Sequence, residues 1–93
     1  MDFKEIIANK ISDVINIDAN ELKSYIEVPK DNANGDYSFP CFRLAKELRK
    51  SPVDIANLIK DGLNIDEIFE KVDVVSGFLN FYINKAIIVK SFF

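Results

Sequence analysis

Residues 77–83 constrain the fold most, because Gly-Phe-Leu-Asn-Phe-Tyr-Ile alternates with the period of a β-strand and gives that strand two different faces. One face is purely aliphatic and aromatic: Leu79, Phe81 and Ile83. The other holds an amide between two aromatic rings: Phe78, Asn80 and Tyr82. The first set is typical of a sheet face buried against helices. We therefore expect the second set to face outward, where rings and an amide are suited to stack on an unpaired base and bond its edge.

Hydrophobic patterns elsewhere predict the partners of this strand. Helical spacing of apolar residues or helix-start signals mark four segments: 2–17, 40–50, 52–63 and 86–93. Strand-like runs occupy residues 25–28, 37–39, 72–75 and 78–83, and the short Ser76-Gly77 turn requires the last two to pair antiparallel. The sequence predicts a single α+β domain over residues 1–93, with a small antiparallel sheet of about four strands packed against three to four helices.

Proline, glycine, serine and acidic residues mark where these helices and loops begin or end. Pro40 opens a helix whose apolar side, which includes Phe42, faces the core; Ser51 caps the next helix, with Pro52 at its first position. Gly62 suits a left-handed cap at the end of the helix predicted for residues 52–63. Residues 30–36 predict a loop ending in a turn at Gly35 and Asp36, whose roles we take as structural, like that of Gly77.

Composition limits the chemistry. With 48% hydrophobic and 29% charged residues, the chain is typical of a globular domain. It has one cysteine, Cys41, and no histidine, which excludes an internal disulfide and removes the usual zinc ligands and general base. We expect no metal, no catalytic residue, no membrane segment and a cytoplasmic location. The acidic pairs at 66–67 and at 31 and 36 have no nucleophile beside them, so we do not assign them to catalysis.

Charge is distributed unevenly. The net charge of −3 argues against a surface that attracts nucleic acid everywhere, yet residues 40–60 carry a local +3. Lys46, Arg49 and Lys50 are candidates for phosphate contacts near the end of their helix. The alternative is that they form an ordinary solvated helix face.

The carboxyl-terminal segment is apolar. Asn84 is a candidate N-cap, and the helix expected after it has no stop signal, so we expect the natural chain to continue past Phe93. This segment also supports a second hypothesis, in which residues 87–93 dock on a protein partner and the domain has no RNA role.

Several short motifs occur in a fixed order: Gly35-Asp36-Tyr37, Leu44-Ala45-Lys46, Ser51-Pro52, Ile55-Ala56 and Gly77-Phe78-Leu79-Asn80-Phe81. Together they resemble the amino-terminal additional domain of arginyl-tRNA synthetases. Many members carry proline directly before the motif glycine, where this chain has Ser76.

The resemblance implies an α+β module that contacts the D-loop corner of tRNA(Arg) and precedes the catalytic domain of the same polypeptide. It implies that Phe78 and Asn80 contact a D-loop nucleotide; Tyr82 lies on the same predicted face. The family's ATP-binding signatures, of the His-Ile-Gly-His and Lys-Met-Ser-Lys types, have no counterpart here. We therefore expect no catalysis by these 93 residues. Catalytic and anticodon-binding domains, with ATP and arginine, are expected in a longer arginine–tRNA ligase.

Overall fold

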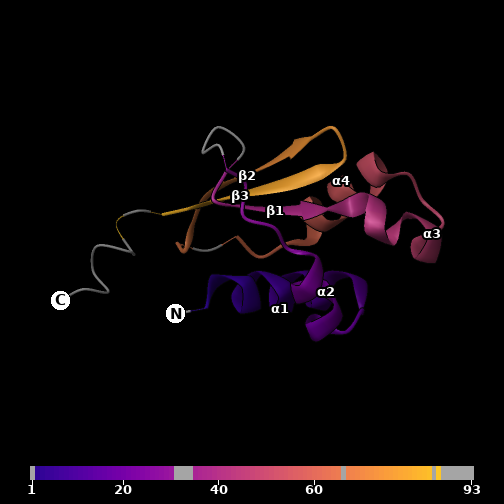
Figure 1. The fold of residues 1–93 in the computed structure, drawn as a ribbon, viewed down its shortest axis with the longest axis horizontal. Coiled ribbons are helices and arrows are strands. Elements are labelled where there is room, and N and C mark those ends of the chain that lie inside the picture. Colours follow the sequence, from indigo (N-terminus) through magenta and orange to yellow (C-terminus); the bar gives the residue numbers. More distant parts are fainter. Residues whose placement is uncertain (1, 31–34, 66, 85, 87–93) are drawn as a thin grey trace.

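The computed structural model describes residues 2–30, 35–65, 67–84 and 86, and shows an α+β fold built on one antiparallel sheet (Figure 1). The strands lie in the order β1-β3-β2, so β3 is central. Along the chain the elements are α1 (Phe3–Ile15), α2 (Ala19–Tyr25), β1 (Tyr37–Pro40), the 3-10 helix η2 (Cys41–Leu44), α3 (Ala45–Leu48), α4 (Pro52–Gly62), β2 (Phe69–Val75) and β3 (Phe78–Ile83). The predicted fold class is confirmed.

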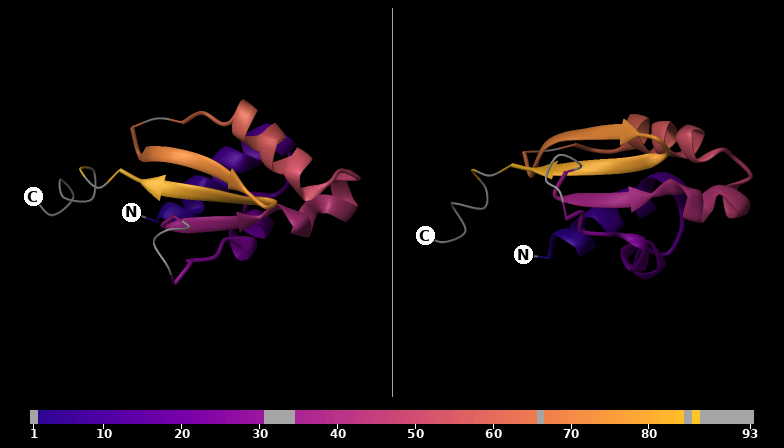
Figure 2. Two further views of the ribbon diagram at one scale, coloured as in Figure 1. Left: turned by 90° about the horizontal axis from the view of Figure 1, so that it is seen from above. Right: turned by 45° about the horizontal axis from the view of Figure 1, so that its top comes forward.

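The inner face of the sheet forms the core. Leu79, Phe81 and Ile83 of β3 are fully or almost fully buried, as the alternation predicted. Helices α1 and α2 lie beneath the strands (Figures 1 and 2), and the buried sides of α1 and α4 close the core. Each fully buried aliphatic or aromatic side chain contributes about 1.5–3 kcal/mol relative to an exposed one, so this inner layer fixes the register of β3.

Over the part of the chain that the structure describes, the sheet has three strands rather than about four, because the segment predicted as a strand at 25–28 is mostly not one. Asp18 caps α2 by accepting from the Glu21 N–H, and the helix continues through Tyr25. What remains of the predicted strand is a single bridge, in which Glu27 and Ser38 exchange two backbone hydrogen bonds of 2.8 Å. Pro29 has no N–H to continue the ladder.

The helix predicted from Pro40 to Lys50 is divided and shorter. The chain forms η2 and then α3, which ends at Leu48, and Arg49 turns left-handed with φ 55°. The cause of the break lies in the next two residues: Pro52 disfavours a helical conformation at Ser51, which is extended at ψ 154°. The predicted restart is confirmed, since the Ser51 side chain accepts the Asp54 N–H at 3.2 Å and caps α4.

The predicted left-handed cap at Gly62 is wrong. Among the described glycines only Gly35 and Gly77 have positive φ, and Gly62 is the last helical residue of α4. Its C-cap, Leu63, is extended, so the chain leaves the helix directly toward the core without a left-handed residue.

The turn between β2 and β3 is as tight as predicted. Ser76 and Gly77 both have positive φ, 50° and 83°, as a type I′ hairpin requires, and the strands pair antiparallel. A proline, locked near −65°, does not fit the conformation that Ser76 adopts. Serine at position 76 is therefore compatible with this turn geometry, whereas proline is not.

Within the described ranges, no helix has both the length and the apolar character needed to cross a bilayer. The same residues bring together no group of three His, Cys, Asp or Glu that could hold a metal ion. Residues 87–93 of the helix predicted for 86–93, and residues 31–34 of the loop predicted for 30–36, lie outside the described residues.

Candidate nucleic-acid interface

The outer face of the sheet carries a row of four polar side chains from four neighbouring segments. Asn80 on the central strand lies opposite Ser38 of β1 and opposite Asp73 of β2, and Ser38 in turn lies opposite Glu27. Residues directly opposite each other in an antiparallel pair project to the same face. The row therefore reads carboxylate, hydroxyl, amide, carboxylate across the sheet.

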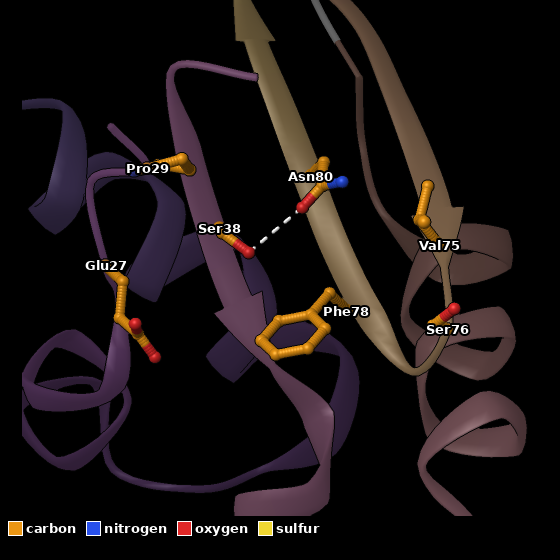
Figure 3. A pocket seen from close by; sticks show the side chains of 7 residues that line it. All are labelled: Glu27, Pro29, Ser38, Val75, Ser76, Phe78 and Asn80. Carbon is orange, nitrogen blue, oxygen red and sulfur yellow. Dashed lines mark hydrogen bonds between the residues drawn. The ribbon is translucent and has the colours of Figure 1, made fainter. Parts of the chain in front are cut away.

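A pocket of about 340 Å³ lies over three residues of this row, Glu27, Ser38 and Asn80 (Figure 3). The segment before β1, β1 itself, and the turn between β2 and β3 all contribute to it. Its lining residues are Glu27, Pro29, Ser38, Val75, Ser76, Phe78 and Asn80. The structure thus brings together Phe78 and Asn80, the two residues that the sequence placed on one face.

Asn80 is less accessible than predicted. Only 3% of it is exposed, whereas the sequence analysis expected an outward-facing side chain. The reason is its place at the centre of the sheet, where strands on both sides and the tightly packed Gly35 cover it. The Ser38 hydroxyl donates to the amide oxygen of Asn80 at 2.9 Å, and the amide nitrogen points away from Ser38 toward the β2 side (Figure 3).

Phe78 is half-buried at the wall of the pocket, and its ring packs edge-on against Phe42, with centroids 5.7 Å apart and planes at 81°. Phe42 is 51% exposed, so the prediction that it faces the core is wrong. The 3-10 geometry explains this: with three residues per turn, Cys41 and Leu44 share the buried side and Phe42 turns outward. Phe42 therefore supports the Phe78 ring from outside the core.

Tyr82 is separated from this pair. It lies on the same face of β3, but it does not line the pocket. Its ring is partly covered by Lys71, whose ammonium group lies 4.6 Å from the ring centroid. This is a favourable cation–π arrangement on the side of β2.

The basic residues lie at the same end of the sheet as the β2–β3 turn. The Cys41 N–H donates to the Gly77 carbonyl at 3.1 Å, which ties η2 and the following α3 to that turn. Lys46 lies on α3, while Arg49 and Lys50 follow it, and all three are exposed. Arg43, by contrast, lies over the Tyr25 ring at 5.5 Å.

The pocket itself is not basic. Glu27 is the only charged residue among its described lining residues, so a phosphate inside the pocket would face a carboxylate and no cation. The wall offers instead an aromatic ring, a hydroxyl and an amide. These groups suit an uncharged, flat, polar-edged ligand, with any phosphate outside.

Gly35 and Asp36 fix the backbone just before β1, at the edge of the outer sheet face. Gly35 has φ +90°, and an added Cβ would lie 2.9 Å from the Phe81 carbonyl oxygen. Asp36 donates its N–H to that same oxygen at 2.9 Å and accepts the Ile83 N–H at 2.8 Å through its carboxylate. The two residues thereby extend the β1–β3 pairing beyond the strand.

Sequence reasoning missed three of the residues around the pocket: Glu27, Ser38 and Phe42. The signal for Ser38 was present, since strand alternation in Tyr37-Ser38-Phe39 sets the serine opposite to the buried Phe39. Glu27 gave no such signal, because its bridge to Ser38 joins segments separated by a loop.

This geometry defines a class of protein: a small α+β domain with an aromatic and amide pocket on the outer face of its sheet. The chain matches the family described as "Arginyl tRNA synthetase N terminal domain" over residues 1–83, and it belongs to that family.

Curated and solved relatives agree with this assignment. The chain is 41% identical over 90 residues to an arginine–tRNA ligase of Clostridium botulinum strain Hall, covering 97% of this chain and 16% of that protein. It is also 41% identical over 87 residues to an arginine–tRNA ligase of Clostridium kluyveri, covering 94% and 15%. The solved Thermus thermophilus arginyl-tRNA synthetase superposes with a TM-score of 0.74 at 29% identity, covering 95% of this chain and 15% of that one. The chain thus spans about 16% of the length of the curated relatives it matches.

Proposed function

We propose that this chain is the N-terminal tRNA-recognition domain of a longer, cytoplasmic arginine–tRNA ligase, and that its pocket holds an unpaired D-loop base of tRNA(Arg). The observation that carries the proposal is that Phe78 and Asn80 line one pocket on the outer sheet face. A base stacked on an aromatic side chain gains about 1–3 kcal/mol, which suits selection of one nucleotide within a much larger complex.

Phosphates would be held outside the pocket. Lys46, Arg49 and Lys50 are exposed at the same end of the sheet, whereas the Glu27 carboxylate is the only charge among the described residues of the pocket wall. This division separates contacts that position the backbone from contacts that read the base. It would also allow a domain of net charge −3 to bind an anion locally.

The domain supplies orientation rather than chemistry in this proposal. ATP and arginine would bind the catalytic domain of the same polypeptide, and the present domain would fix the tRNA relative to it. Holding a substrate in register lowers the entropic cost of the reaction elsewhere. Loss of the pocket contacts should therefore reduce selection of tRNA(Arg) more than the rate of arginine activation.

The test is a titration of this chain with tRNA(Arg) and with a non-cognate tRNA at low and moderate salt. Phe78→Leu keeps apolar bulk but removes the flat ring, and should weaken tRNA(Arg) binding about fivefold or more, as expected for a lost stack. Phe78→Tyr keeps the ring and serves as the matched control.

The salt dependence tests the basic residues separately. Lys46→Ala should reduce the slope of log K against log salt by about 0.7–0.9 if that lysine neutralises one phosphate. Lys60→Ala, an exposed lysine on α4, is the control. Binding that is insensitive to both Phe78→Leu and Asn80→Ala, in variants with wild-type circular dichroism, would refute the proposed function.

A further inference from the structure

The orientation of the Asn80 amide is set by its neighbour Ser38 in the row across the sheet. On the β1 side, the Ser38 hydroxyl donates to the amide oxygen at 2.9 Å in a buried contact. On the β2 side, Asp73 lies directly opposite Asn80, and its carboxylate pairs with Lys71 Nζ at 3.5 Å. The Ser38 donor favours the amide oxygen toward β1, which leaves the nitrogen toward β2, as Figure 3 shows.

Ser38 is held firmly enough to act in this way. Its residue is only 7% exposed, and its backbone N–H and C=O both bond to Glu27 at 2.8 Å. It also pairs with Asn80 in the register of β1 and β3. The hydroxyl therefore reaches the amide from a fixed backbone position on one side of the pocket.

The amide nitrogen remains available. The described residues supply it with no hydrogen bond, although Asn80 is 97% buried and lines the pocket. Among the described residues no buried side-chain nitrogen or oxygen lacks a partner, so the unpaired amide nitrogen is the part of Asn80 that opens to the pocket, where a ligand can accept from it. With its oxygen engaged by Ser38, the side chain presents a donor.

We propose that Ser38 is a positioning residue that fixes the Asn80 amide so that the pocket offers an N–H donor and selects a base edge carrying an acceptor at that point. This inference rests on the proposed function, because it concerns how the same pocket reads its base. An Asn side-chain amide that can rotate by half a turn pairs with either a donor or an acceptor on the base. An amide held in one orientation pairs with only one of these two groups.

The test compares bases that stack alike but present opposite groups on the Watson–Crick edge: a ring acceptor beside an amine in one member of each pair, and a ring N–H beside a carbonyl in the other. Adenine and cytosine have an acceptor ring nitrogen on the Watson–Crick edge, whereas hypoxanthine and uracil have a ring N–H there. The ¹⁵N-labelled chain would be titrated by NMR with hexanucleotides of adenosine, inosine, cytidine and uridine. Affinity ratios within the adenosine–inosine pair and the cytidine–uridine pair report the edge contact and cancel most of the stacking difference.

In the wild-type chain the acceptor member of each pair should bind about fivefold more tightly, as expected for one net hydrogen bond. In Ser38→Ala both ratios should fall below about twofold. Ser38→Thr keeps the hydroxyl on a residue that suits a strand and should retain the wild-type ratios. A purely structural role for Ser38 would weaken binding of all four hexanucleotides alike and leave the ratios unchanged.

A second readout needs no variant. The side-chain NH₂ resonances of Asn80 in the wild-type chain should move downfield when the adenosine hexanucleotide binds, because these protons then donate to the base. Unmoved NH₂ resonances in a complex whose Phe78 signals do shift would overturn the inference and leave the proposed function intact. Affinity ratios near one in the wild-type chain, or wild-type ratios preserved in folded Ser38→Ala, would likewise overturn the inference and leave the proposed function intact. Absence of any Phe78-dependent RNA binding would overturn both.

Discussion

Replacing Gly35 by alanine should destabilise the domain by about 2–3 kcal/mol. A positive φ of +90° costs an L-residue about 1–2 kcal/mol. The added methyl group would also lie 2.9 Å from the Phe81 carbonyl oxygen, which accepts the Asp36 N–H. Moving that backbone apart weakens a hydrogen bond whose net contribution is about 0.5–1.5 kcal/mol.

Urea unfolding followed by far-ultraviolet circular dichroism measures this loss directly, since the chain has no tryptophan to report by fluorescence. A domain of this size has a total stability of about 5–14 kcal/mol, so the expected change is large. It corresponds to a decrease in Tm of about 10–20 °C.

Gly62→Ala is the matched control. There too an added methyl group would lie 2.9 Å from its nearest neighbour, but that neighbour is the Val14 side chain, and Gly62 does not have positive φ. The gain in helix propensity, about 1 kcal/mol, offsets the displacement of Val14, and the net change should stay within about 1 kcal/mol. If Gly35→Ala loses no more stability than Gly62→Ala, with unchanged m-values, the argument from φ and backbone contact is refuted.

Two further sets of substitutions, at Ser51 and Asp36, and two measurements on the Cys41 thiol test other features. Ser51→Ala should cost about 1 kcal/mol of unfolding free energy through loss of the α4 cap, whereas Ser51→Asp keeps an acceptor and should cost less; equal losses would contradict the capping role. Asp36→Ala leaves the Ile83 N–H without its acceptor and should cost about 1–3 kcal/mol, while Asp36→Asn retains an acceptor and should lose less in the same urea assay. Burial raises the pKa of the Cys41 thiol from 9.0 to about 12, so a disulfide reagent at pH 8 should react at the rate of unfolding, and fast reaction in folded protein would refute the burial. Because the unfolded thiol ionises first, stability should also decline as pH rises from about 9 toward 12.

Local signals in the sequence predicted the parts of the fold that local physics decides. Strand alternation identified the buried face of β3, and the Ser51-Pro52 pair identified the start of α4. The errors arose where a distant contact decides the outcome. Tyr25 completes α2 instead of opening a strand, and the extended segment after it pairs only at Glu27, because its partner Ser38 lies across a loop.

The candidate site was predictable to the same extent. Alternation placed Phe78 and Asn80 on one face, and the pocket contains both. The burial of Asn80 was not predictable, because it depends on β3 being the central strand, and strand order is a tertiary property. Phe42 was assigned to the wrong side because apolar spacing does not distinguish a 3-10 turn from an α-helical one.

The row from Glu27 to Asp73 is assembled from segments far apart in the chain, and this couples recognition to folding. Detachment of the edge strand β1 would remove both Glu27 and Ser38 from the pocket while leaving the β2–β3 hairpin intact. A ligand that requires both Ser38 and Asn80 therefore penalises that partial opening, by about 2.7 kcal/mol when present at a hundred times its dissociation constant. Amide hydrogen exchange along β1 should therefore slow in the complex, because a bound ligand would stabilise the pairing of β1 with β3.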